Sequence, residues 1–154
     1  MIVADEIFQK LGMQRDEFIH LMNGKRENTA MQTLDIEYME LAPDRVVMTM
    51  PVGPKTHQPA GILHGGASVL LAETAASIAS FINIDSKKYA AVGLEINANH
   101  IKSKSGGIVT AVATPLHKGR KTMVWDVKIT DELNKLICVS RCTVAIIDNP
   151  DAKR

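Results

Sequence analysis

The stretch from residue 65 to 81 constrains the fold more than any other part of the sequence. It begins with Gly65-Gly66, follows a loop that contains Pro59 and Gly61, and then runs without glycine or proline through residues that mostly favour helix. Apolar side chains occupy so much of its circumference that a half-exposed surface helix is excluded. The sequence therefore predicts one long helix that is buried in the domain.

A few polar residues interrupt this apolar helix, and three of them share one side. At about 100° per residue, Glu73, Ser77 and Ser80 fall within an arc of about 60°. A buried carboxylate is costly unless it is paired or takes part in chemistry. Two interpretations are open: Glu73 forms an ion pair with an Arg or Lys elsewhere in the chain, or it belongs to an active site.

The start of the helix favours the second interpretation. Free backbone N–H groups and the positive end of the helix dipole at Gly65 and Gly66 suit a developing oxyanion. Because glycine has no side chain, a substrate carbonyl can approach the backbone closely at these positions. The helix thus combines a candidate oxyanion site at its start with a carboxylate further along.

The segment from Gln58 through His64-Gly65-Gly66 to Glu73 and Ser77 resembles the hotdog-fold acyl-CoA thioesterases. It is most similar to the branch with a catalytic Glu on the central helix, which includes the Arthrobacter-type 4-hydroxybenzoyl-CoA and phenylacetate-pathway thioesterases. The resemblance covers about residues 32–148. His-Gly-Gly alone is a weak motif, but a helical Glu at this spacing and a Gln six residues before the His make it specific.

This resemblance implies a catalytic role for five residues. The Gly65 N–H and the Gln58 side chain polarise the thioester carbonyl, and His64 holds the loop and the thioester region. Glu73 acts as a general base on water or as a nucleophile through a mixed anhydride. Ser77, where many relatives carry Thr, orients the water or the carboxylate. The expected reaction is hydrolysis of an acyl-CoA or aryl-CoA thioester to the free acid and coenzyme A.

Alternating apolar residues predict strands on both sides of the helix. Residues 34–52 form a hairpin that turns at Pro43-Asp44, and four strands follow at 90–101, 108–117, 123–130 and 135–147. The apolar positions expected to share one face are Val92, Leu94, Ile96 and Ala98, then Ile108, Val112 and Leu116, then Met123, Trp125, Val127 and Ile129. Six antiparallel strands wrapped around one helix make an α+β domain with the hotdog architecture, and this follows without the motif.

The chain divides into three parts. Residues 1–33 form an N-terminal helical extension of the same domain, in one or two amphipathic helices broken at Gly12 and Gly24. Residues 34–148 form the hotdog thioesterase domain, and residues 149–154 form a flexible tail. A chain of 154 residues is one domain's worth.

Composition excludes several classes of function. A net charge of +1 gives no basic field for nucleic acid, and no apolar run approaches the ~18 residues of a membrane span. Because the first residues do not combine a basic start with an apolar block, no export signal is expected and the protein is placed in the cytoplasm.

Cysteine and histidine spacing predicts neither a disulfide nor a metal site. Cys138 and Cys142 lie on one face of a predicted strand about 13 Å apart, too far to bond to each other. His57, His64 and His100 show no metal-ligand spacing. No cofactor is expected, since coenzyme A is part of the substrate.

Basic residues gather in two predicted loops, 102–107 and 117–121. One interpretation is a set of solvated turn residues. The other is recognition of the coenzyme A phosphates, assisted by serine hydroxyls and glycine backbone N–H groups, and the family resemblance favours it. The residues expected to bind substrate or coenzyme A are Gly66, His100, Lys102, Lys104, Ser105, Gly106, His117, Lys118, Gly119 and Arg120.

Helix geometry predicts that one chain cannot hold a complete active site. Gly65 and Glu73 are eight residues apart, about 12 Å along the helix axis, yet an oxyanion donor must sit about 3 Å from the carbonyl oxygen. Two copies with antiparallel helices can place Gly65 of one opposite Glu73 of the other. The resemblance implies such a dimer, often paired again into a tetramer, a dimer of dimers.

Two other functions remain open. A hotdog dehydratase or hydratase would also use a His and a carboxylate, but the chain lacks the His-Phe-Pro loop usual in those enzymes. A non-catalytic acyl-CoA-binding module is the third candidate, and the intact Glu73 argues against it.

Overall fold

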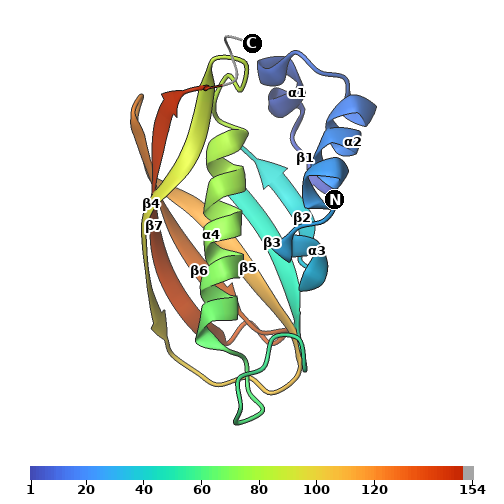
Figure 1. The fold of residues 1–154 in the computed structure, drawn as a ribbon, viewed down its shortest axis with the longest axis vertical. Helices are drawn as coiled ribbons and strands as arrows, with labels where there is room; N and C mark the ends of the chain where they lie inside the picture. The colour runs from blue at the N-terminus through green and yellow to red at the C-terminus, as the bar shows by residue number, and fades with distance from the viewer. Residues whose placement is uncertain (151–154) are drawn as a thin grey trace.

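The computed structural model, which describes residues 1–150, shows a seven-stranded sheet wrapped around one long helix, α4 (Gly65–Phe81) (Figure 1). The strands are β1 (Ile2–Val3), β2 (Glu37–Ala42), β3 (Arg45–Val52), β4 (Tyr89–His100), β5 (Gly107–Lys118), β6 (Thr122–Thr130) and β7 (Leu136–Asp148). Their order in the sheet is β1-β2-β3-β5-β6-β7-β4. The predicted α+β hotdog fold is confirmed.

The sheet has one strand more than the six expected. Ile2–Val3 pairs in parallel with Glu40 and Leu41 of β2, while every other pairing is antiparallel. The sequence pattern had assigned these two residues to a helix. A two-residue strand is too short to produce a period of its own, so only its tertiary partner reveals it.

Three helices follow β1: α1 (Asp5–Leu11), α2 (Arg15–Arg26) and α3 (Ala30–Thr33). Gly12 ends α1 in the left-handed conformation, with φ of 62°, as expected. The predicted break at Gly24 is wrong, because α2 continues through it to Arg26. An interior glycine costs about 1 kcal/mol, which burial of Phe18 and Met22 on the same helix offsets.

Helix α4 is covered along most of its length, and Gly66 is its one exposed residue. Its sheet-facing residues are small or apolar and fully buried: Leu71, Ala72, Ala75, Ala76 and Ala79. Alanines at these positions let the helix lie close to the sheet, so the predicted buried helix is confirmed.

Ser80 does not share a surface with Glu73 and Ser77, contrary to the expectation of one polar stripe. The Trp125 Nε1–H donates to Ser80 Oγ at 2.8 Å, and the hydroxyl donates to the Ala76 carbonyl at 2.9 Å. Ser80 is fully buried, whereas Glu73 and Ser77 are half-buried. Although Glu73, Ser77 and Ser80 lie within about 60° of one another around α4, Ser80 is on the side that faces the core, and the other two are on the side left open.

We expect Ser80→Ala to destabilise the protein by about 1–3 kcal/mol, because it leaves the buried Trp125 N–H without an acceptor. Ser77→Ala, three residues away on the same helix, should change stability by less than about 0.5 kcal/mol. Urea unfolding of both variants measures the difference. Equal stability of the two would show that the Trp125 hydrogen bond contributes nothing.

Two strands face the core differently from the prediction. A bulge between Gly93 and Glu95 changes the phase of β4, so Ile96 and Ala98 pack on the core while Val92 and Leu94 are 40% and 61% exposed. In β5 the buried residues are Val109, Ala111 and Ala113, whereas Ile108 and Leu116 are exposed. Both faces of β5 carry apolar side chains, so alternation does not decide which one faces α4. The expected inward face of β6 is confirmed.

Both cysteines are buried on one face of β7 and are free thiols, as expected. Burial, with smaller contributions from the carboxylates of Glu73 and Glu95, raises the pKa of the Cys142 thiol to about 11. Cys142 therefore stays protonated at neutral pH and is unsuited to act as a nucleophile.

The chain after β7 is anchored at its first residue. Asn149, expected in the flexible tail, donates from its N–H to the Lys88 carbonyl at 2.8 Å and from Nδ2 to the Ser86 carbonyl at 2.9 Å. Residues 151–154 of the predicted tail lie outside the described residues. Within residues 1–150, no helix is long and apolar enough to cross a membrane.

Candidate active site

The start of α4 is shaped by His64, the N-cap residue. Its Nδ1 accepts a hydrogen bond from the Gly66 N–H at 2.8 Å, and its carbonyl accepts from Ala67 and Ser68. Because Nδ1 is an acceptor, the neutral ring carries its proton on Nε2. The Gly65 N–H has no hydrogen-bond acceptor among the described residues. It is therefore available to a ligand, at the positive end of the helix dipole.

Gln58 lies in the loop before α4 with its side chain oriented by the backbone. Its Oε1 accepts from the Ala60 N–H at 2.7 Å, and its carbonyl accepts from the Gly61 N–H at 2.9 Å. Gly61 has φ of 74°, the left-handed conformation that this turn needs. The Gln58 Nε2 forms no hydrogen bond within residues 1–150, so its hydrogens can be donated to a ligand.

Gly65 and Gln58 line one cavity of about 280 Å³, together with His100, Lys102 and Ser68. The His100 Nε2 lies 2.7 Å from the place where a Cβ on residue 65 would be, so the ring occupies the space that glycine leaves. Ser68, which is 2% exposed, also lines this cavity but was not among the site residues predicted from the sequence. Its hydroxyl makes no hydrogen bond within the described part of the chain. A serine one turn after Gly65 on an otherwise apolar helix was the available signal.

Glu73 lines a second cavity of about 510 Å³ with Gly66 and Ser77. In the part of the chain that the structure describes, its carboxylate forms no ion pair or hydrogen bond, so no Arg or Lys within residues 1–150 pairs with it, which favours the active-site interpretation. The carboxylate rests against β4, where Oε1 lies 2.8 Å from the place a Cβ on Gly93 would occupy. Glu73 is thus positioned by packing and is free to accept a proton.

The carbonyl-polarising donors and the carboxylate face different cavities of one chain. Gly65 and Gln58 line the first and Glu73 and Ser77 the second, and the helix separates Gly65 from Glu73 by about 12 Å along its axis. A single reacting carbonyl cannot contact both groups in this arrangement.

The two basic loops lie at opposite ends of β5, which has 12 residues, so they are about 36–40 Å apart in one chain. Lys104 forms an ion pair with Glu132 at 2.5 Å, and Lys118 forms one with Asp44. Both lysines are therefore engaged within the chain. Lys102 and Arg120 are exposed and form no ion pair among residues 1–150.

The other residues of these two loops that were predicted to bind coenzyme A contribute to the conformation of the loops. The Ser105 carbonyl lies 3.1 Å from His57 Nε2, which ties the first loop to the segment before α4. Gly106 has open space around it, and the His117 ring fills the space beside Gly119 in the second loop.

Glu132 fixes the first loop, because its carboxylate accepts hydrogen bonds from Lys104 and from the Ile108 N–H at 2.6 Å. These contacts, Lys104 first, lower the pKa of Glu132 from 4.5 to about 2. Since the pKa is lower in the folded state, this contribution to stability is complete above about pH 4.5 and disappears as the pH falls to about 2.

We therefore expect Glu132→Gln to lower Tm at neutral pH, and the gap between wild type and variant to close between about pH 4.5 and pH 2. Thermal unfolding followed across this pH range measures it. Glu27→Gln, an exposed carboxylate without a hydrogen bond within residues 1–150, is the control and should show no such gap. A gap that persists at pH 2 would contradict the assignment.

Comparison with known proteins identifies the family. The model of the Thioesterase superfamily matches residues 60–138, which include His64, Gly65, Glu73 and all of α4. The chain belongs to the thioesterase superfamily. A 1,4-dihydroxy-2-naphthoyl-CoA hydrolase from Listeria monocytogenes is 50% identical to it over 115 residues, which cover 75% of this chain and 93% of the relative. The hydrolase of the same name from Escherichia coli is 43% identical, covering 84% and 94%.

Solved structures of thioesterases agree with this assignment. A thioesterase from Haemophilus influenzae superposes with a TM-score of 0.82 and 41% identity, covering 92% of this chain and 96% of its own. Together these likenesses make the protein a thioester hydrolase with the hotdog fold.

Proposed function

We propose that this thioesterase hydrolyses acyl-CoA or aryl-CoA thioesters to the free acid and coenzyme A. The observation that carries the proposal is that two polar groups of α4 have no hydrogen-bond partner within residues 1–150. The Gly65 N–H and the Glu73 carboxylate each lack a hydrogen-bond partner in residues 1–150, and each lines a cavity. Buried polar groups are normally satisfied, so groups left open beside cavities suit a substrate.

In the proposed reaction, the Gly65 N–H and the Gln58 Nε2 donate hydrogen bonds to the thioester oxygen. These donors stabilise the negative charge that develops when the carbonyl carbon is attacked. Glu73 takes a proton from the attacking water, and the tetrahedral intermediate collapses by breaking the carbon–sulfur bond. The leaving thiolate takes up the proton that Glu73 received, and the acid is released. Ser77, one turn beyond Glu73, has its hydroxyl free in the described structure to hold the water.

Glu73 could instead attack the carbonyl itself and form a mixed anhydride that water then hydrolyses. Single-turnover hydrolysis in ¹⁸O-labelled water separates the two routes. Label that enters the Glu73 carboxylate supports the anhydride, and label confined to the released acid supports the general base.

We further propose that two chains share each active site. Strand β4 ends the sheet and, among residues 1–150, pairs only with β7, and its outward-facing Val92 and Leu94 are exposed. A free strand edge with apolar neighbours suits pairing with a second copy. Antiparallel pairing about a two-fold axis would also make the two α4 helices antiparallel, bringing Gly65 of one chain toward Glu73 of the other.

The same two-fold arrangement would unite the basic loops. The loop 102–107 lies at the start of β5 and the turn 117–121 at its end, so antiparallel copies place the loop of one chain at the same end as the turn of its partner. Lys102 and Arg120, two cations of these segments that form no ion pair within residues 1–150, would then face the coenzyme A phosphates together.

A thiol-release assay with a panel of acyl-CoA and aryl-CoA thioesters tests the proposed function. The Listeria and Escherichia relatives are named for 1,4-dihydroxy-2-naphthoyl-CoA, so a dihydroxynaphthoyl thioester belongs in the panel beside benzoyl and medium-chain thioesters. We expect free thiol from at least one CoA thioester. Binding of acyl-CoA without release of thiol would refute hydrolysis and favour a dehydratase or a binding module.

A further inference from the structure

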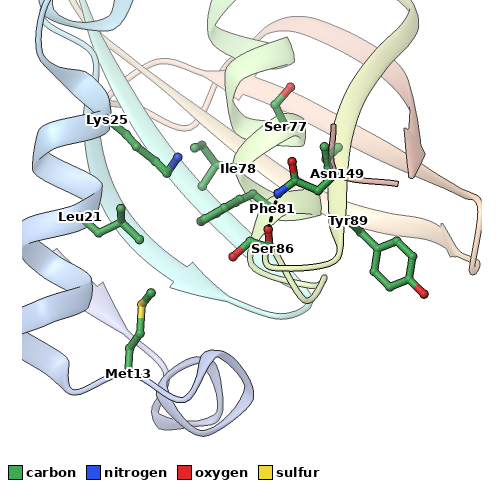
Figure 2. Close-up of a pocket in the computed structure, with 11 residues that line it drawn as sticks. Met13, Leu21, Lys25, Ser77, Ile78, Phe81, Ser86, Tyr89 and Asn149 are labelled. Atoms are coloured by element: carbon green, nitrogen blue, oxygen red, sulfur yellow. Dashed lines mark hydrogen bonds between the residues drawn. The ribbon is translucent and has the colours of Figure 1, made fainter. Parts of the chain in front are cut away.

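A cavity of about 510 Å³ extends from the proposed catalytic groups toward the N-terminal helices. It lies between α2, the second half of α4 and the start of β4 (Figure 2). Its walls are largely apolar, with Met13, Leu21 and Phe81 among them. Ser77 and Ile78 line both this cavity and the one that contains Glu73, so the two spaces adjoin along α4.

The length of the path fits an acyl group. From Glu73 to Phe81 the helix rises about 12 Å over eight residues, so a thioester carbonyl at Glu73 leaves room for a medium-length chain or a two-ring aryl group. Ser77 and Ile78 lie midway along this path. The acyl group is thus the part of the substrate that can fill the apolar cavity.

Among residues 1–150 that line this cavity, Lys25 alone is charged. It extends from α2 toward α4 in Figure 2, and its Nζ lies 4.8 Å from the centre of the Phe81 ring. The Lys25 ammonium forms no ion pair or hydrogen bond with any residue from 1 to 150. A cation held over an aromatic ring beside an apolar cavity, without a carboxylate partner, is complementary to a negative or oxygen-rich ligand.

We propose that this cavity holds the acyl group and that Lys25 selects thioesters whose acyl group ends in an electronegative oxygen, either a carboxylate or an aryl hydroxyl. The inference rests on the proposed thioester hydrolysis and adds to it the chemistry of the far end of the substrate. Lys25 acts by binding that end and takes no part in the bond-breaking step.

Two matched pairs of thioesters test the selection and separate the two sources of oxygen. Adipoyl-CoA and hexanoyl-CoA have chains of equal length and differ by a terminal carboxylate. A naphthoyl-CoA and its analogue with a hydroxyl on the distal ring differ by that hydroxyl. We expect wild type to prefer one or both oxygen-bearing members by about tenfold in kcat/KM, since a charge-assisted hydrogen bond is gained.

Lys25→Met should abolish this preference and leave kcat/KM for the apolar members within about twofold, while Lys25→Glu should reverse the preference between adipoyl-CoA and hexanoyl-CoA. Lys87→Met is the matched control, because it removes an exposed charge that does not line the cavity, and it should keep the wild-type preference.

The outcomes distinguish this inference from the proposed function. Wild type that hydrolyses the thioesters without preference, or a preference that survives in Lys25→Met, overturns the role of Lys25 while hydrolysis stands. Wild type that releases thiol from none of the panel and from none of the four compounds removes both proposals.

Discussion

Glu73→Gln should lower kcat by about 10²–10⁴-fold, the range of a lost general base, and by more if Glu73 is the nucleophile. Glutamine has nearly the same shape and fits the same space against Gly93, but it can neither take a proton from water nor attack the carbonyl. Acyl-CoA binding should persist, because the apolar cavity and the donors at Gly65 and Gln58 are unchanged.

Steady-state thiol release and equilibrium binding of a CoA thioester measure the two effects separately. Glu6→Gln is the matched control: this carboxylate lies on α1, is exposed and forms no ion pair or side-chain hydrogen bond within residues 1–150. It should turn over substrate as wild type does. A Glu73→Gln enzyme within a few-fold of wild type would remove Glu73 from the mechanism.

Mixing two inactive variants should restore activity if the active site is shared. Chains with Glu73→Ala lack the carboxylate, and chains with Gly65→Pro lack the N–H donor at a helix position where proline is tolerated. In a mixed dimer one site carries both lesions and the other carries neither. Random subunit exchange should therefore restore about a quarter of wild-type activity.

Gln58→Ala can replace Gly65→Pro in this experiment, which keeps it informative if a side chain at position 65 displaces His100 and disturbs folding. Exchange is verified by mass spectrometry of differently tagged chains. Verified exchange with activity no higher than that of the unmixed variants would show that each chain carries its own complete site.

The long helix was predictable because local signals agree there. Gly65-Gly66 marks the start of α4, and the sequence after it has no helix breaker until the structure ends the helix at Phe81. The cap by His64 was not predictable in detail, since it depends on a ring nitrogen meeting the Gly66 N–H in three dimensions. The residue types of the candidate site could be read from the sequence, but their orientation depends on the fold.

Strand faces were predictable only where polar and apolar residues alternate. In β6, Asp126 and Lys128 separate the buried Trp125, Val127 and Ile129, and the prediction is confirmed. In β5 both faces are apolar, so packing against α4 decides between them.

Side-chain partners were the least predictable feature. The position of Lys104 in a basic loop predicted a phosphate ligand. In the structure its ammonium instead forms an ion pair with the carboxylate of Glu132, 28 residues later in the chain. Tertiary pairs of this kind leave no local pattern. Lys25 was not predicted as a site residue for the same reason, because it lies beside Phe81 only in the folded chain.

Around its bulge, β4 has a different structural role on each of its two faces. At Gly93 the strand passes so close to Glu73 that any side chain there would displace the carboxylate. At the neighbouring Val92 and Leu94 the same strand presents apolar side chains on the outside of the sheet, at its free edge. Under the proposed mechanism, a side chain at Gly93 would disturb catalysis, and a polar substitution at Val92 or Leu94 would disturb the proposed subunit contact. Under the shared-site arrangement, a substitution here that weakens subunit contact would also make specific activity fall on dilution.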